Sequence, residues 1–272
     1  MPARVLHVSD LHVGSNDRGR DDVEAAVREL VARTAPELVL ATGDLTHRNR
    51  REQHERAAAF LRSLGPPVLA IPGNHDLPAF PPRRLAAPFA AFLSCWPETE
   101  PSYRSERVVA CCLNSVRPWR YQRGALGPAQ LERAGQVLAG APAGALRVVA
   151  LHHHLTGAPW RTGKRSIPAR TRVLAALAAA GAELVVSGHL HQSVVVERRE
   201  LLFAEGLPGV VLAVAPGLGR PRPTRHAEAS GCHVYEAEAE TLRVRTLAWT
   251  NGGFAEIAER CFPRAQPPLP SA

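Results

Sequence analysis

The segment that decides the fold is RVLHVSDLH, residues 4–12, in which an apolar run ends in Asp10 and His12. A short apolar run of this length is typical of a β-strand, and the two polar residues that follow it are common metal ligands. Four further apolar runs, at 37–41, 67–71, 147–151 and 183–187, are also followed within three residues by Asp, Asn or His. The polar segments that follow are Gly43-Asp44, Gly73-Asn74-His75-Asp76, His152-His153-His154 and Gly188-His189-Leu190-His191.

Polar side chains at consecutive strand ends can converge on one edge of a sheet, although they are far apart in sequence. Asp10 and His12 are two residues apart, as are His189 and His191, so in an extended strand both members of each pair point to the same side. Asp44 can bridge two ions through its two oxygens, as two-metal hydrolytic sites require. Carboxylates combined with imidazoles favour Mn, Fe or Zn. The sequence therefore predicts a centre with two divalent metal ions.

The composition fits a folded protein of 272 residues with 45% hydrophobic residues. We expect a single domain over residues 1–261 and an extended, proline-rich tail over 262–272. The chain has no apolar run of the roughly 18–20 residues that span a bilayer, and its N-terminus lacks a signal-peptide pattern. The five cysteines show no CxxC pairing, which favours a reducing compartment. These features predict a cytoplasmic protein.

The formal net charge is +8. A basic surface favours an anionic substrate and raises its rate of encounter. Arginine supplies 32 of the 33 basic residues, with Lys164 as the only lysine. This preference agrees with a general bias towards Ala, Arg, Gly and Pro, so it does not by itself indicate phosphate binding.

Helical spacing of apolar residues predicts helices over 21–35, 52–64, 128–139 and 168–180. Their alternation with the five strands indicates mostly parallel strands covered by helices. After His191 the pattern changes to strands at 194–198, 209–215, 232–236 and 242–247, joined by short turns. We therefore expect a second, more antiparallel sheet packed against the first.

The five polar motifs, in this order, resemble those of the calcineurin-like metallophosphoesterase superfamily over about residues 3 to 250. The strings GDLTHRN (43–49) and AIPGNHD (70–76) are most similar to the bacterial class III cyclic-nucleotide phosphodiesterases. The resemblance implies an α/β fold, a four-layer α/β/β/α sandwich of two mixed β-sheets flanked by helices. It implies a binuclear phosphodiesterase that hydrolyses a small phosphodiester, such as a cyclic nucleotide, by attack of a metal-activated hydroxide.

The same resemblance implies roles for particular residues. It assigns the first metal to Asp10, His12, Asp44 and His191. It assigns the second metal to Asp44, Asn74, one histidine of the run 152–154, and His189, so that Asp44 bridges the two ions. His75 is then the general acid that protonates the leaving oxygen.

The histidine triplet offers more than one ligand. His152 corresponds best to the family's ligand, because it comes first after the strand. In an extended chain His153 points away from the site, and His154 points towards its mouth, so His154 is the alternative ligand. The family usually continues this run with prolines, whereas Leu155 follows here, and this departure concerns the shape of the loop.

Substrate contacts are expected from His47, His154 and the loop GAPWRTGKRS at 157–166. In that loop Trp160 can stack on a base, while Arg161 and Arg165 can contact phosphate. A solvated basic loop explains the same residues without any function.

The expected partner is a small anionic phosphoester, and nucleic acid is a less favoured one. A nuclease resembling the DNA-repair exonucleases remains an alternative, although those enzymes tend to carry capping domains for which this chain has little room. A UDP-diacylglucosamine-type pyrophosphate hydrolase is another alternative, but that branch usually has Arg at the position of His75. A non-catalytic scaffold is the alternative outside enzymes; such proteins lose ligands or the acid histidine, which this chain retains.

Overall fold

The computed structural model describes residues 2–15, 19–120, 122–157, 164–201, 209–219, 230–250 and 252–264. In this part of the chain the helices are α1 (Arg20–Thr34), α2 (Arg51–Arg62), α3 (Arg83–Ala86), α4 (Ala90–Leu93), α5 (Pro128–Ala139), α6 (Arg170–Ala179) and α7 (Arg198–Leu201), with a 3₁₀ turn η1 at Asn74–Asp76. The strands are β1 (Ala3–Val8), β2 (Leu38–Ala41), β3 (Val68–Ala70), β4 (Ser102–Arg104), β5 (Val108–Leu113), β6 (Leu146–Leu151), β7 (Leu184–Ser187), β8 (Val194–Glu197), β9 (Val211–Val214), β10 (Gly231–Ala237), β11 (Thr241–Thr250) and β12 (Gly253–Pro263).

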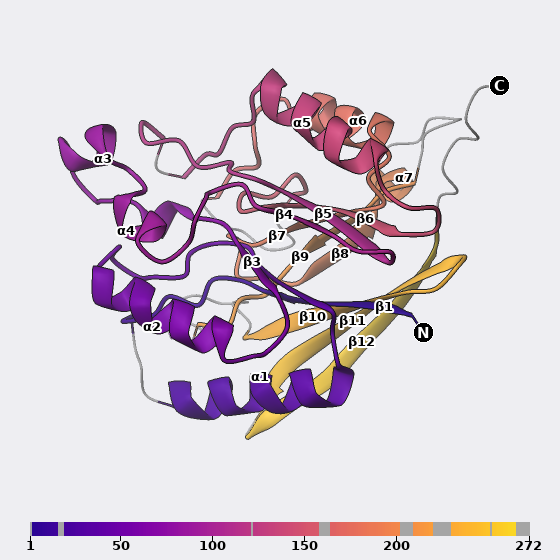
Figure 1. Ribbon diagram of the computed structural model, residues 1–272, viewed down its shortest axis with the longest axis horizontal. Coiled ribbons are helices and arrows are strands. Elements are labelled where there is room, and N and C mark those ends of the chain that lie inside the picture. Colours follow the sequence, from indigo (N-terminus) through magenta and orange to yellow (C-terminus); the bar gives the residue numbers. More distant parts are fainter. Residues whose placement is uncertain are drawn as a thin grey trace.

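These strands form two mixed six-stranded sheets that lie between two layers of helices (Figure 1). The first sheet has the order β12-β11-β10-β1-β2-β3, in which β1, β2 and β3 are parallel and β10, β11 and β12 are antiparallel to their neighbours. The second has the order β4-β5-β6-β7-β9-β8, with four parallel strands inside and antiparallel strands at both edges. The predicted α/β/β/α sandwich of two mixed sheets is confirmed.

The division of strands between the sheets differs from the sequence-based expectation. The five motif-bearing strands do not share one sheet, because β1, β2 and β3 belong to the first and β6 and β7 to the second. The later strands are divided as well, since β8 and β9 extend the second sheet and β10 pairs with β1. Hydrophobic periodicity identifies a segment as a strand, but pairing depends on contacts between residues that are far apart in sequence.

Three apolar clusters hold the layers together. The inner cluster lies between the sheets and includes Leu40 from the first and Val148 from the second. The two outer clusters join α1 and α2 to the first sheet, with Leu30 at their contact, and α5 and α6 to the second, with Leu177. Strands covered on both faces need continuous apolar runs, which explains why the central strands β5 and β6 are buried along their whole length.

The four helices expected from sequence, corresponding to α1, α2, α5 and α6, are confirmed within two residues at each end. Strand β12 was not predicted, and it ends at Pro263, beyond the expected start of the tail at 262. Residues 265–272 of that tail lie outside the described residues, so the tail and the single-domain boundary stay predictions. Within the described chain, no helix has both the length and the apolar character needed to cross a membrane.

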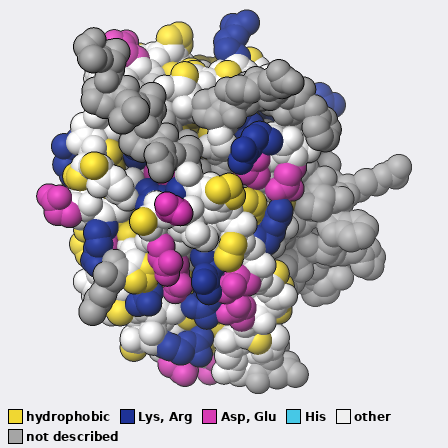
Figure 2. Space-filling view, turned by 90° about the vertical axis from the view of Figure 1, so that its right-hand side faces the viewer, with side chains coloured by type: hydrophobic (Ala, Val, Ile, Leu, Met, Phe, Trp, Pro, Cys, Tyr) yellow, Lys and Arg dark blue, Asp and Glu magenta, His cyan; other side chains and the backbone are white. Residues whose placement is uncertain are grey.

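The side of the molecule on which β1 begins carries mixed charges. Figure 2 looks onto this side and shows basic and acidic side chains next to one another, with no histidine in view. Near the amino-terminal ends of β1 and β5, Arg4 pairs with Glu236 at 3.2 Å and Arg107 pairs with Glu37 at 2.7 Å. The histidine-bearing motifs follow the opposite, carboxyl-terminal ends of the parallel strands.

Candidate metal centre and active site

The five motifs meet in a buried region where the carboxyl ends of β1, β2 and β3 approach those of β6 and β7. The site therefore lies between the edges of two sheets, and not on one edge of a single sheet as the sequence suggested. Backbone hydrogen bonds join the loops within the first sheet, since the Asp10 N–H donates to Gly43 O at 2.9 Å and the His12 N–H to Asp44 O at 2.9 Å. Between the sheets, the His189 N–H donates to Asp10 Oδ2 at 2.9 Å.

The candidate ligands lie in tight turns after the strands. Asp10, His12, Asp44, His189 and His191 all have positive φ, between 48° and 72°. Residues other than glycine adopt this conformation rarely and at a cost of about 1–2 kcal/mol each. The expectation that strand alternation aligns Asp10 with His12 was wrong, because β1 ends at Val8 and left-handed turns orient both side chains.

A first donor group consists of Asp10, His12, Asp44 and His191, whose ligand atoms all lie within 4.8 Å of one another. His191 Nε2 lies 3.1 Å from Asp10 Oδ1 and 3.1 Å from His12 Nε2. His12 Nε2 lies 3.7 Å from Asp44 Oδ2. All four residues are buried.

A second donor group surrounds the other oxygen of Asp44. His152 Nε2 lies 3.4 Å from Asp44 Oδ1 and 3.2 Å from Asn74 Oδ1. Its Nδ1–H donates to Thr42 O at 2.8 Å, and this bond directs Nε2 towards the site. The His189 ring lies 5.0 Å from the His152 ring, centroid to centroid. Asp44 thus faces both groups, one through each oxygen.

The donor set fits a pair of divalent ions. In the described part of the chain, neither ring nitrogen of His189 has a hydrogen-bond partner, although its side chain is completely buried. His12 Nδ1 and Asp44 Oδ2 are buried without a hydrogen bond as well. Buried polar atoms are normally satisfied, so unpaired donors that converge with carboxylates are what a metal site requires.

The protonation states agree with this fit. Burial lowers the pKa of His12 and of His189 well below the usual value, so both rings are neutral at pH 7 and offer a lone pair. Burial alone raises the pKa of Asp44, but His152, His75 and His12 around it outweigh that effect and hold the pKa low. Neutral imidazole and ionised carboxylate are the forms that bind metals.

Two glycines allow the ligand loops to approach one another. A Cβ on Gly43, which has φ +89°, would lie 2.8 Å from His152 Nδ1 and 2.7 Å from Gly73 N. A Cβ on Gly188 would lie 1.8 Å from Ser9 Oγ and 2.5 Å from Asp10 Oδ2. Any larger side chain at either position displaces a candidate ligand or its support.

Two supporting residues were not identified from sequence. Asp76 does not face the donor groups; its carboxylate accepts bonds from the backbone N–H groups of Gly73, Leu45 and Thr46 at 2.8–3.0 Å and from Thr46 Oγ1 at 2.8 Å. It therefore joins the loops after β2 and β3. Ser9 Oγ donates to Asp10 Oδ2 at 2.6 Å and orients that carboxylate. The Asp in the GNHD string was a signal for the first, but short polar residues are too common to indicate such bonds in advance.

The rest of the histidine triplet packs around His189. The His153 ring lies 4.7 Å from the His189 ring, so the expectation that it points away was wrong. Its Nδ1 is paired with Ser115 Oγ at 2.9 Å. The His154 ring stacks on the His189 ring at 5.9 Å, and burial followed by the charge of Lys164 lowers the pKa of His154 to about 3. The ammonium of Lys164 donates to His189 O.

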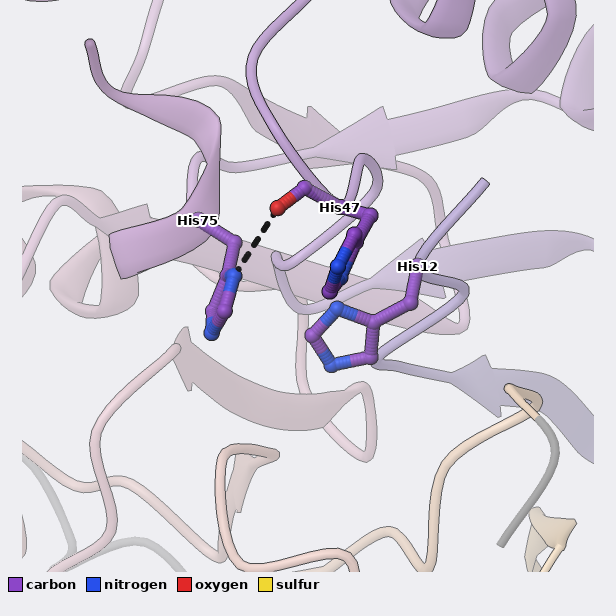
Figure 3. A group of neighbouring side chains, drawn as sticks. All are labelled: His12, His47 and His75. Atoms are coloured by element: carbon purple, nitrogen blue, oxygen red, sulfur yellow. Dashed lines mark hydrogen bonds between the residues drawn. The ribbon is translucent and has the colours of Figure 1, made fainter. Parts of the chain in front are cut away.

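His75 lies at the accessible side of the donor groups. Its Nδ1 is 3.1 Å from His47 O (Figure 3). Its backbone N–H donates to Asp44 Oδ1 at 2.8 Å. The His75 ring is perpendicular to the His12 ring at 4.8 Å and stacked on the His47 ring at 5.8 Å. His12, His47 and His75 also have ligand atoms within 4.8 Å of one another.

Two pockets adjoin the candidate site residues. One, of about 490 Å³, is lined by His47, Arg48, Arg50, Asn74, His75, Leu77, Ala79 and Phe80. The other, also about 490 Å³, is lined by Arg123, His154, Thr156, Gly157, Lys164, Arg165, Ser166, Ile167, Pro168, Ala169 and Arg170. The predicted contacts His47, His154 and Arg165 thus line pockets, whereas Trp160 and Arg161 lie outside the described residues.

A separate buried network lies between the sheets. Tyr235 Oη is 2.8 Å from His7 Nδ1 and 3.2 Å from His233 Nδ1, and His233 Nε2 is 3.0 Å from Ser193 Oγ. Burial lowers the pKa of His233 to about 3. These histidines support the structure and do not belong to the donor groups.

Comparison with known families identifies one match, to the calcineurin-like phosphoesterase model, over residues 3–193. Three curated relatives are similar in part. Glycerophosphodiester phosphodiesterase GpdQ of Enterobacter lignolyticus is 36% identical over 80 residues, 26% of this chain and 29% of the relative. DNA double-strand break repair protein Mre11 of Aeropyrum pernix is 35% identical over 115 residues, 38% of this chain and 27% of the relative. The 3′,5′-cyclic adenosine monophosphate phosphodiesterase CpdA of Haemophilus influenzae is 30% identical over 164 residues, 58% and 56%.

The matches thus span between about a quarter and just over half of each relative's length. Among solved structures, the purple acid phosphatase PPD1 from yellow lupin (Lupinus luteus) superposes with a TM-score of 0.69 at 14% identity. That superposition covers 94% of this chain and 53% of the phosphatase, and it concerns the fold alone.

Proposed function

Since the chain belongs to the calcineurin-like phosphoesterase family, we propose that it is a binuclear metal-dependent phosphodiesterase. One observation carries the proposal: two buried donor groups share Asp44, with one carboxylate oxygen facing each group. A bridging carboxylate is what a pair of ions about 3.5–4 Å apart requires.

In this proposal Asp10, His12, Asp44 and His191 hold the first ion. The second is held by Asp44, Asn74, His152 and His189. When bound, the two ions supply Lewis-acid charge for the phosphoryl oxygens and lower the pKa of a nucleophilic water. Mn, Fe and Zn all suit this mixture of carboxylate, amide and imidazole donors.

His153 is the competing donor for the second position. Its ligand atom lies within 4.8 Å of those of His152 and His189. His152 is preferred because its Nε2 approaches Asp44 and Asn74 directly, while His153 is paired with Ser115.

His75 acts as the proton donor to the leaving oxygen. Its Nδ1–H is bonded to the His47 carbonyl, so Nε2–H is the group that delivers a proton. An imidazole is suited to this step because its ordinary pKa lies near neutral pH. The backbone bond from His75 to Asp44 fixes the position of the acid relative to the ligands.

The proposed substrate is a small anionic phosphodiester, with a cyclic nucleotide as the first candidate. The names of two relatives, a glycerophosphodiester and a cyclic adenosine monophosphate phosphodiesterase, support a diester. The partial similarity to a DNA repair protein keeps a nuclease activity as the second candidate. The cytoplasmic location stays a prediction.

The experiment is a metal-reconstitution assay on bis-p-nitrophenyl phosphate, followed by a panel of cyclic nucleotides, oligonucleotides and nucleotide-sugar lipids with added Mn. Hydrolysis that requires metal and is lost in Asp44→Asn supports the proposed class. Full activity after complete chelation, or metal binding without hydrolysis of any diester in the panel, rejects it.

A further inference from the structure

The pocket beside His75 combines an exposed aromatic ring with unpaired cations. Phe80 has 79% of its surface exposed, the largest value among the exposed large hydrophobic residues of the described chain. Leu77 and Ala79 add apolar surface to the same pocket. An exposed Phe is not unusual by itself, but this one lines a pocket that contains a candidate ligand and the candidate acid.

Two arginines on the same pocket are available to an anion. Arg48 and Arg50 are exposed, and within the described residues neither forms an ion pair. The adjacent Arg51, in contrast, pairs with Glu55 at 2.8 Å. No Asp or Glu is among the residues that line the pocket. The guanidinium groups of Arg48 and Arg50 therefore carry positive charge that no carboxylate lining the pocket neutralises.

The pocket lies beside the proposed proton donor, His75. The assignment of its occupant rests on the proposed function, in which the group that departs from phosphorus leaves on the side of His75. The pocket is lined by His75 and by Asn74. The group that occupies it is therefore the leaving group of the diester.

The second pocket, which is lined by His154, differs in chemistry. It is lined by Arg123, Lys164, Arg165 and Arg170, and no Phe, Tyr or Trp is among its described lining residues. Among the described lining residues of the two pockets, Phe80 beside His75 is thus the only Phe, Tyr or Trp.

We propose that the pocket beside His75 selects a leaving group that is planar, aromatic and negatively charged. Phe80 stacks on its ring, and Arg48 and Arg50 contact its anion. Linear nucleotide diesters, in which the departing alcohol carries a base and a further phosphate, have this chemistry. A cyclic mononucleotide has no second anion on its departing hydroxyl, so within the proposed class the pocket favours linear diesters. Stacking of a base on an aromatic side chain is sequence-tolerant and substantial, and Arg contacts with phosphate or carboxylate are directional.

The test uses methyl phosphodiesters with matched leaving groups. The second ester group is 4-carboxyphenyl, its neutral isostere 4-carbamoylphenyl, or 2,2,2-trifluoroethyl, and kcat/KM is measured on the metal-loaded protein. The variants are Phe80→Ala and the double variant Arg48→Gln/Arg50→Gln. Matched controls are Ile257→Ala, another exposed apolar residue, on β12, and Arg33→Gln, an exposed arginine on α1.

We expect Phe80→Ala to lower kcat/KM about 5- to 30-fold for both aryl esters and to leave the trifluoroethyl ester within about 2-fold. The double arginine variant is expected to remove a preference of about 5-fold for carboxylate over carboxamide. Equal effects on aryl and alkyl esters, or no preference for the carboxylate in the unmodified protein, would overturn the inference. Hydrolysis that survives chelation would instead reject the proposed function, so the two failures are distinguishable.

Discussion

Replacing His75 with alanine removes the proposed proton donor and leaves the metal donors in place. The bond from His75 to Asp44 uses the backbone N–H, at 2.8 Å, and is therefore retained in the variant. The imidazole is not a member of either donor group that contains Asp44. General acid catalysis contributes about 10²–10⁴-fold, or about 3–5.5 kcal/mol of the barrier. We expect a loss of that size on diesters with poor, alkyl leaving groups and a loss below about 10-fold on p-nitrophenyl esters, which need little protonation.

The assay measures turnover on alkyl and p-nitrophenyl diesters alongside metal content. His47→Ala is the matched control, because it removes the ring stacked on His75 and keeps the carbonyl that accepts the Nδ1–H bond. It should retain most of kcat on alkyl esters, and its loss should fall on KM, because His47 lines the pocket beside His75. Equal losses in His75→Ala for good and poor leaving groups, or a loss of bound metal, would refute the role of His75 as the acid.

Three further predictions concern the structure around the site. Asp76→Asn leaves some of the four N–H and O–H donors around that carboxylate unpaired, so the free energy of unfolding in urea should fall by roughly 2–5 kcal/mol; an unchanged midpoint would show that the loops after β2 and β3 do not depend on it. His233 has a folded pKa of about 3, below its unfolded value near 6.5, so the unfolded chain binds more protons between these values and stability is lost as pH falls through this window. Lowering the pH from 7.5 to 5 should cost about 2 kcal/mol from this residue, and His233→Gln should show a correspondingly smaller loss; an identical pH profile in both proteins would contradict the assignment. Gly188→Ala places a Cβ 1.8 Å from Ser9 Oγ, so metal affinity should fall at least 10-fold. The control Gly253→Ala, whose Cβ meets no atom within 4 Å, should leave metal affinity unchanged. Equal metal affinities in the two variants would show that the loop at Gly188 accommodates a Cβ without displacing the ligands.

Local periodicity predicted the location of the helices, and the resemblance to the metallophosphoesterases predicted the four layers. The sequence also placed the polar motifs at strand ends, and the structure brings Asp10, His12, Asp44 and His191 together. Sheet membership was less predictable. The return of β10 to pair with β1 requires contacts between residues more than 200 positions apart, such as Val5 with Tyr235.

The local geometry of the ligands was also beyond the sequence. Alternation along a strand was the simplest reason for the side chains of Asp10 and His12 to point to the same side of the sheet. Both residues instead have left-handed backbone conformations, which their residue types alone do not predict. The contact of His153 with His189 also lies beyond a strand end, because β6 ends at Leu151. The conformation of such turns depends on tertiary hydrogen bonds, such as those of Asp76. These bonds form only when loops that are distant in sequence come together.

The most direct test of the two-ion centre is the number of metal ions bound per chain, measured by elemental analysis after reconstitution with Mn, together with hydrolysis of bis-p-nitrophenyl phosphate. Shared coordination by Asp44 predicts two ions per chain in the unmodified protein. In Asp44→Asn it predicts the loss of at least one ion together with the activity. Retention of two ions and full turnover in Asp44→Asn, or a single ion in the fully active unmodified protein, would contradict the account.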